Sequence, residues 1–180
     1  MTVPASPFQR ILGRSFGELA GPVRRLHSLT VATTATGLAD VKVAAGQIPL
    51  LICWSAGLPK AGRQIQVSVN FQPDGNGSEL WSRQFVGRKY ASTFRVEHRA
   101  NEDLLVEQFG PFRLEFRIRV NADSLSWLLV GVRCIGVRAP KWAVPKVRCS
   151  ESSDGDRYLF DIDAALPLIG PLIHYRGWLS

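Results

Sequence analysis

The sequence has few of the residues that carry disulfide, metal or redox chemistry. Its 180 residues include three cysteines and three histidines, and none of them stands in a C-x-x-C, H-x-H or H-E-x-x-H arrangement. Three cysteines cannot all pair within one chain, so we expect free thiols, which are typical of proteins in a reducing compartment. These spacings argue against a disulfide framework and predict no metal site.

The sequence also lacks a long hydrophobic run. The longest, Ile48 to Trp54, contains a proline, whereas a membrane-spanning helix needs about 20 apolar residues. The N-terminal segment MTVPASPFQRILGR has no continuous apolar stretch of the kind found in signal peptides. We therefore expect no membrane span, and a soluble protein of the cytoplasm.

Nucleotide-binding and nucleophile motifs are missing as well. No G-x-G-x-x-G follows a strand-like segment, so a bound dinucleotide is not predicted. The segment Cys53-Trp54-Ser55-Ala56-Gly57 contains the serine and last glycine of a nucleophile elbow but not its first glycine. We expect no cofactor, and the sequence favours a protein that is not an enzyme.

Negative charge is scarce. The chain has 22 lysines and arginines against 15 acidic residues, a net charge of +7. The excess comes mainly from arginines scattered between residues 83 and 157 rather than gathered in one run, so the composition does not favour nucleic-acid binding. Arg113, Arg117 and Arg119 share the outer side of one predicted strand, as either a solvated sheet face or a docking strip for an acidic protein.

The length fits one domain, residues 1–180, with a single core. Near the start, Ser6-Pro7 is a helix-start signal, and apolar residues recur at helical spacing from Phe8 to Leu19. The segment Ile48 to Ala56 is apolar on every side and ends before a glycine, which predicts a short buried helix. Helices are therefore expected to cover part of the core.

From Gly62 onward, apolar and polar residues alternate with a period of two. The clearest half-buried strand runs from Phe112 to Val120, and turn-forming residues stand at 73–77, 100–103 and 121–123. The predicted fold is mainly β (α+β), a strongly curved antiparallel meander or barrel of about nine or ten strands. Short N-terminal helices and one buried helix are expected to plug or cover its concave side.

One arginine, in the segment ELWSRQF, stands where a strand should bury an apolar side chain. Trp81, Arg83 and Phe85 share one side of that strand, so Arg83 points inward between two aromatic rings. Glu107 stands in a matching position of a later strand, between two apolar residues of the inner side. The two charges are either a buried pair that fixes strand register or the polar anchors of an apolar pocket.

Other side chains complete the predicted ligand site. Trp81, Phe85, Phe109 and Tyr175 are expected as its walls, although Tyr175 also fits an ordinary core tyrosine. His27 ends the N-terminal helical segment and is expected near the pocket entrance, with a capping, surface or core histidine as the alternative. In this site Arg83 would bind the carboxylate or phosphate head of a ligand.

Several short segments follow one another along nearly the whole chain: LGRSFGELAGPVRRLH near the start, ELWSRQF followed by Tyr90 and Ser92, LLVEQFGPFRLEF, and HYRGWL near the end. In order and spacing they resemble the bacterial domain of unknown function 4166 family. The resemblance implies little chemistry. Members often resemble the C-terminal partner of a saccharopine-dehydrogenase-like NAD(P)-binding domain, which implies that any nucleotide-dependent redox step comes from a separate reductase partner.

The leading hypothesis from the sequence is a binding module for a hydrophobic or amphipathic small molecule. A second hypothesis is an enzyme or accessory subunit beside a reductase, with His27 or Glu107 in proton transfer. A third is a protein-interaction domain that uses its basic sheet face. No catalytic constellation distinguishes the second from the first.

Overall fold

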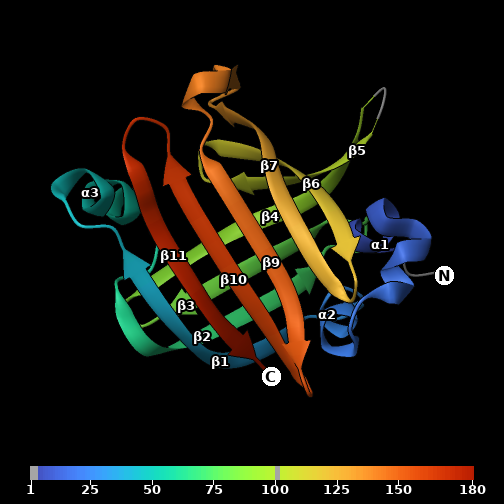
Figure 1. Cartoon of the computed structure of the whole chain (residues 1–180). Helices are drawn as coiled ribbons and strands as arrows, with labels where there is room; N and C mark the ends of the chain where they lie inside the picture. Colours follow the sequence, from blue (N-terminus) through green and yellow to red (C-terminus); the bar gives the residue numbers. More distant parts are fainter. Residues whose placement is uncertain (1–3, 100–101) are drawn as a thin grey trace.

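The fold is a closed barrel of antiparallel strands (Figure 1). The computed structural model describes residues 4–99 and 102–180. The strands, in chain order, are β1 (Thr33–Val43), β2 (Gly62–Pro73), β3 (Glu79–Phe85), β4 (Arg88–His98), β5 (Asp103–Phe109), β6 (Phe112–Asn121), β7 (Ser124–Cys134), β8 (Val137–Arg138), β9 (Lys146–Asp154), β10 (Arg157–Leu166) and β11 (Gly170–Leu179).

Strand pairing runs continuously around the barrel. Neighbours follow chain order from β1 to β7, then β7 pairs with β9, and β9, β10 and β11 lead back to β1. The two-residue β8 only extends the end of β7. A closed barrel of ten strands is therefore the outcome of the predicted meander, and closure removes the exposed edges that an open sheet would carry.

Turn chemistry and alternation explain why these segments form strands. In β6, Phe116 and Ile118 are buried in the barrel, whereas Arg119 on the opposite side is exposed. Between β2 and β3, the Asp74 carboxylate accepts hydrogen bonds from two backbone amides of the turn that follows it. The predicted turn at 100–103 includes residues 100–101, which lie outside the described part of the chain.

Strands β1 and β11 approach each other closely at two glycines. A Cβ atom on Gly37 would lie 1.8 Å from the Trp178 carbonyl oxygen, and one on Gly177 would lie 2.2 Å from the Leu38 carbonyl oxygen. No side chain fits at either position. The two glycines allow the strands to cross tightly where the sheet bends.

Three short helical segments close one end of the barrel, called here the plug end (Figure 1). They are α1 (Pro7–Leu12), the 3₁₀ helix η1 (Gly13–Glu18) and α2 (Gly21–Leu26). The Ser6 hydroxyl accepts a hydrogen bond from the Gln9 amide, and the Gln9 side chain accepts one from the Ser6 amide, so α1 begins with a capping box. Phe8 and Val23 are fully buried against the strands.

The helix α3 (Gln47–Ser55) lies at the opposite end of the barrel (Figure 1). It forms where a helix was predicted, but the expectation that it is buried was wrong, because Leu51 and Trp54 are each 64% exposed. Pro49 and Cys53, one turn apart, are its buried side chains. A helix that is apolar on every side has more apolar surface than its one contact face can cover.

Across residues 4–99 and 102–180, no helix is long and apolar enough to cross a membrane.

A buried histidine fastens the plug to the barrel wall. His27 follows α2, and its Nε2 atom lies 2.5 Å from the Glu151 Oε2 atom on β9, with both side chains buried. The His27 ring packs on Phe8 at 3.8 Å between ring centroids and on Trp81 at 5.5 Å. Ser6 donates a hydrogen bond to the His27 carbonyl oxygen at 2.5 Å. The start of the helical segment, at Ser6, and its end, at His27, are therefore in direct contact.

Removing this contact should destabilise the fold strongly. His27→Ala leaves the Glu151 carboxylate buried without its histidine, and we expect the free energy of unfolding to fall by about 3–5 kcal/mol. Urea denaturation followed by circular dichroism measures it. The control is Arg25→Ala, which breaks the exposed pair with Asp156 and should cost at most about 1 kcal/mol. Equal losses for the two variants would contradict the role of His27.

Candidate functional site

Arg83 points into the barrel, as the pattern of ELWSRQF predicted. Its Nη1 atom donates a hydrogen bond to the Ser92 hydroxyl at 2.8 Å and lies 3.7 Å from the Glu107 Oε1 atom. Its guanidinium carbon also lies 5.1 Å from the Trp81 ring centroid and 5.4 Å from that of Tyr90. Arg83 and Glu107 therefore form the ion pair that the sequence suggested, across the intervening strand β4.

The contacts of Arg83 leave much of its hydrogen-bonding capacity unused. A guanidinium has five N–H donors, and Ser92 is the one hydrogen-bond acceptor found for it among the described residues. At 3.7 Å, Glu107 lies beyond the usual length of a charge-assisted hydrogen bond. Water reaches both side chains, because 15% of the Arg83 surface and 14% of the Glu107 surface are accessible. An oxygen-bearing ligand would find unused donors here.

Aromatic side chains surround this polar pair on the side toward α3. Tyr90 stacks on Phe85 at 6.2 Å between ring centroids, and Phe109 meets Tyr90 edge to face at 5.6 Å. Tyr175 meets Phe85 edge to face at 6.2 Å. Phe85 is buried, whereas Tyr90, Phe109 and Tyr175 are only partly buried. The predicted walls Phe85, Phe109 and Tyr175 therefore lie together.

Ionisation inside the barrel leaves one firm positive charge and several neutral donors. For Arg83, burial lowers the pKa but nearby Tyr90 and Glu107 more than offset it, so the pKa is raised overall. Burial raises the pKa of Tyr175 well above its ordinary value, and the neighbouring Tyr90 adds to this effect. The Tyr90 hydroxyl is buried with no hydrogen-bond partner among the described residues. Protonated tyrosines can donate hydrogen bonds to a ligand at neutral pH.

His27 lies away from this group, in the plug. Trp81 stands between the two regions, since its ring contacts both His27 and the Arg83 guanidinium. The Trp81 indole donates a hydrogen bond of 2.9 Å to the buried Glu79 carboxylate. No hydrogen bond or ion pair found within residues 4–99 and 102–180 joins His27 to Arg83. Trp81 therefore lies between His27 in the plug and the polar and aromatic side chains around Arg83.

Sequence reasoning did not assign Tyr90, Ser92 or Cys149 to the site. Ser92 and Tyr90 share the inward side of β4 with the fully buried Phe94, so strand alternation was a usable signal. Cys149 lies on β9, and burial, followed by the charge of Glu151, raises its pKa well above the ordinary value. Its segment had too little alternation to fix which residues point inward.

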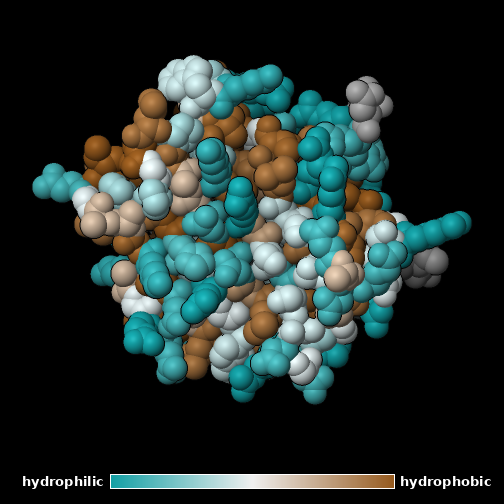
Figure 2. All heavy atoms as spheres, in the orientation of Figure 1, coloured by the Kyte–Doolittle hydropathy of each residue, from teal (hydrophilic) through white to brown (hydrophobic). Residues whose placement is uncertain are grey.

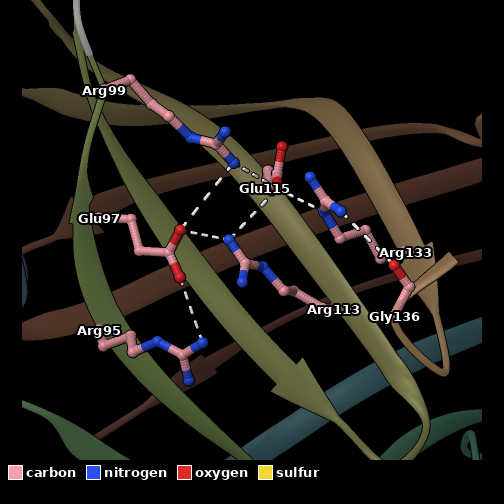
Figure 3. A network of polar contacts seen from close by, with 7 residues as sticks. All are labelled: Arg95, Glu97, Arg99, Arg113, Glu115, Arg133 and Gly136. Atoms are coloured by element: carbon pink, nitrogen blue, oxygen red, sulfur yellow. Dashed lines mark hydrogen bonds and ion pairs between the residues drawn. The ribbon is translucent and has the colours of Figure 1, made fainter. Parts of the chain in front are cut away.

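The outer side of β4, β6 and β7 carries an ionic network, drawn in Figure 3. Glu115 is buried and pairs with Arg99 at 2.8 Å, with Arg113 at 3.4 Å and with Arg133 at 3.5 Å. Arg113 also pairs with Glu97. Arg117 pairs with Glu102 at 2.6 Å. Two of the three arginines expected to dock an acidic partner, Arg113 and Arg117, are therefore neutralised by glutamates of the same chain.

A hollow of about 440 Å³ lies elsewhere, on the outer side of β1, β11, β10 and β9. Asp40, Asp161, Arg176 and Trp178 contribute to its lining. Asp161 accepts a hydrogen bond from His174 at 2.9 Å, and the Asp161 and Arg176 side chains are exposed, so the hollow lies on the outer surface of the barrel. None of the inward-facing residues around Arg83 contributes to it.

Comparisons with known proteins describe the chain as a whole. A family model described as a domain of unknown function (DUF4166) matches residues 19–179. The match begins at Leu19, so it includes ELWSRQF, LLVEQFGPFRLEF and HYRGWL but only part of the first motif. A search of curated proteins gives no match.

The three cysteines should differ in their rate of alkylation. Cys134 is exposed, whereas burial raises the pKa of Cys53 and of Cys149. Since the thiolate is the reactive form, iodoacetamide at pH 8 should label Cys134 first and the other two much more slowly. Peptide mass mapping over time measures each rate. If Cys149 were alkylated as fast as Cys134, its placement in the barrel interior would be wrong. The variant Cys134→Ser is the control, because it leaves only the labelling of Cys53 and Cys149 to be measured.

Proposed function

Since this chain belongs to the family described as a domain of unknown function (DUF4166), whose description names no activity, we propose a function from the contents of its barrel. The chain is a binding module for an amphipathic small molecule. The anionic head of the ligand, a carboxylate or phosphate, binds beside Arg83. Its apolar part lies among the aromatic side chains toward α3.

The observation that carries this proposal is the state of Arg83. It is a charged group inside a barrel, reachable by water and joined to Ser92 by one hydrogen bond. A structural buried pair would have closer and more complete contacts, because an incompletely paired buried charge is costly. Unused donors of a guanidinium suit a carboxylate or phosphate, which it binds through two parallel hydrogen bonds.

Glu107 has a defined role in this proposal. Its carboxylate competes with an anionic ligand for the guanidinium, since both bind the same donors, and its Oε1 atom lies 3.7 Å from the Arg83 Nη1 atom. It also keeps Arg83 from being an unpaired buried charge. The neutral hydroxyls of Tyr90 and Tyr175 supply further donors, and Phe109 supplies apolar surface.

His27 is a structural residue in this proposal. Its contacts with Phe8 and Trp81 support the floor of the site from the plug end. The ligand therefore enters from the end where α3 lies rather than beside His27. Small-molecule sites in barrels commonly combine apolar walls with a few polar groups at the base, and this arrangement agrees with that pattern.

Affinity measurements with a matched pair of probes test the anionic head. We expect the barrel to bind a fluorescent long-chain fatty acid more tightly than the alcohol of the same chain length. Arg83→Gln should weaken acid binding by roughly 10- to 100-fold, since a hydrogen bond to a charged group contributes about 1.5–3 kcal/mol. Glu107→Gln should strengthen it, because a competing carboxylate is removed. Fluorescence titration measures each affinity.

Two controls separate binding from folding. Arg119→Gln removes an exposed arginine from the outer side of β6 and should leave both affinities unchanged. The double variant Arg83→Met with Glu107→Leu replaces the pair by apolar residues, which usually leaves stability equal or higher. It should fold and lose its preference for the acid. If it folds and binds the acid as before, the pair is structural and the proposal is wrong.

A ligand acquired during expression should be detectable directly. Native mass spectrometry after gentle purification should give a mass above that of the 180-residue chain, and denaturation should release the difference as a small amphipathic molecule. Arg83→Gln should reduce the occupied fraction, whereas Arg119→Gln should not. A wild-type protein that carries no ligand and also binds neither probe would overturn the proposal.

A further inference from the structure

Most of the large apolar side chains that the structure exposes lie at the end of the barrel opposite the plug. Leu168 is 96% exposed and Ile135 is 82% exposed, and each stands at the tip of a turn. Figure 2 shows hydrophobic residues gathered on the side where α3 lies. We call this end the α3 rim and define it by the exposed side chains of Leu51, Trp54, Val86, Ile135, Trp142 and Leu168.

The topology brings these side chains together from separate parts of the chain. Strands alternate in direction around the barrel, so every second connection lies at the same end. The connections at the α3 rim are residues 44–61, 86–87, 110–111, 135–145 and 167–169. These connections are far apart in the sequence and meet only because the strands between them span the barrel.

The α3 rim also differs from the plug end in its acidic residues. None of these five connections contains an aspartate or glutamate. Five exposed cations lie within these connections or within two residues of them: Lys60, Lys89, Arg138, Lys141 and Lys146. None of the five takes part in an ion pair among the described residues. The connections at the plug end carry Asp74, Glu102, Asp123 and Asp156, beside exposed arginines of the plug helices: Arg10, Arg14, Arg24 and Arg25.

We propose that the α3 rim docks on the surface of an anionic phospholipid membrane. Apolar side chains would enter the boundary between headgroups and acyl chains, with Trp54 and Trp142 at the depth where tryptophan is enriched. The lysines and arginines around them would contact anionic headgroups. This inference stands on the surface alone and does not depend on the ligand proposed for the barrel interior.

The observations favour a membrane over other occupants of this surface. A second copy of the chain would bring two cationic rims together without any acidic residue to pair with them, which is unfavourable. The apolar side chains protrude singly from several turns and one helix, so each can enter a fluid layer without a complementary protein pocket. Cations interleaved with apolar side chains are typical of surfaces that bind anionic lipid.

Co-sedimentation with vesicles tests the proposal. The full chain should bind vesicles of phosphatidylcholine and phosphatidylserine, and bind pure phosphatidylcholine vesicles much more weakly. Raising the salt concentration should weaken binding, because it screens the headgroup charge. Brominated acyl chains should quench the fluorescence of Trp54 and Trp142, measured against a variant in which both are phenylalanine.

Matched variants locate the binding surface. Leu51→Ser with Trp54→Ser should lower the partition coefficient at least about tenfold, since both exposed side chains would otherwise enter the apolar layer. The control, Val31→Ser with Leu128→Ser, removes two exposed apolar residues from other parts of the surface and should have no effect. Neither pair lies in the core, so both proteins should fold.

Charge variants complete the test. Lys60, Lys89 and Lys141 changed together to glutamine should lower partition on the order of a hundredfold, since each cation near the surface contributes about fivefold. Arg14, Arg119 and Arg176 changed to glutamine remove the same charge elsewhere and should act much less. Equal losses from the two sets, or no vesicle binding at low salt, would overturn the proposal. Self-association through the rim, abolished by Leu51→Ser with Trp54→Ser and seen without vesicle binding, would overturn it as well.

Discussion

The constraint on which this structure depends is the interior volume of a closed ten-strand barrel. About eight strands already enclose as much space as side chains from the wall can fill, so ten strands enclose more than the wall can fill alone. The chain fills one half with its own N-terminal segment, where Phe8, Val23 and His27 are fully buried. The other half is lined by partly buried side chains, among them Tyr90 and Tyr175.

Buried polar groups are distributed according to this division. At the plug end, the histidine and glutamate are in close contact and nearly free of solvent, which suits a fastening. Halfway along the barrel, Arg83 and Glu107 are farther apart and partly wet. The same two residue classes, a base and a carboxylate, therefore have different physical roles because the packing around them differs. Distance and solvent access distinguish the roles of the two pairs.

Much of the wall was predictable from the sequence. Alternation placed β2 to β6 and the inward side chains Arg83, Glu107 and Phe109, because a half-buried strand imposes a period of two on its residues. The same rule made Glu107 a candidate partner for Arg83, and the structure shows the two atoms Nη1 and Oε1 3.7 Å apart. The family, too, was correctly identified from the order of short motifs.

What the sequence could not predict depends on contacts between distant residues. His27 meets Glu151 across 124 positions, and no local pattern announces that contact. The surroundings of α3 were misjudged for a related reason, since an apolar composition on every side is equally typical of a buried helix and of a helix that exposes apolar residues. The α3 rim is visible only when the connections at one end of the barrel are viewed together.

The pairing of β1 with β11 has a consequence for how the chain reaches this fold. Val41 lies opposite Tyr175, so the two strands that seal the barrel come from opposite ends of the sequence. During synthesis, the plug and β1 emerge early and must wait for β9 and β11 before Glu151 and the sealing strand exist. Contacts of such long sequence separation make folding slow. Until then the nascent sheet has two open edges and an uncovered concave face, which is the state in which such a chain is most prone to aggregate.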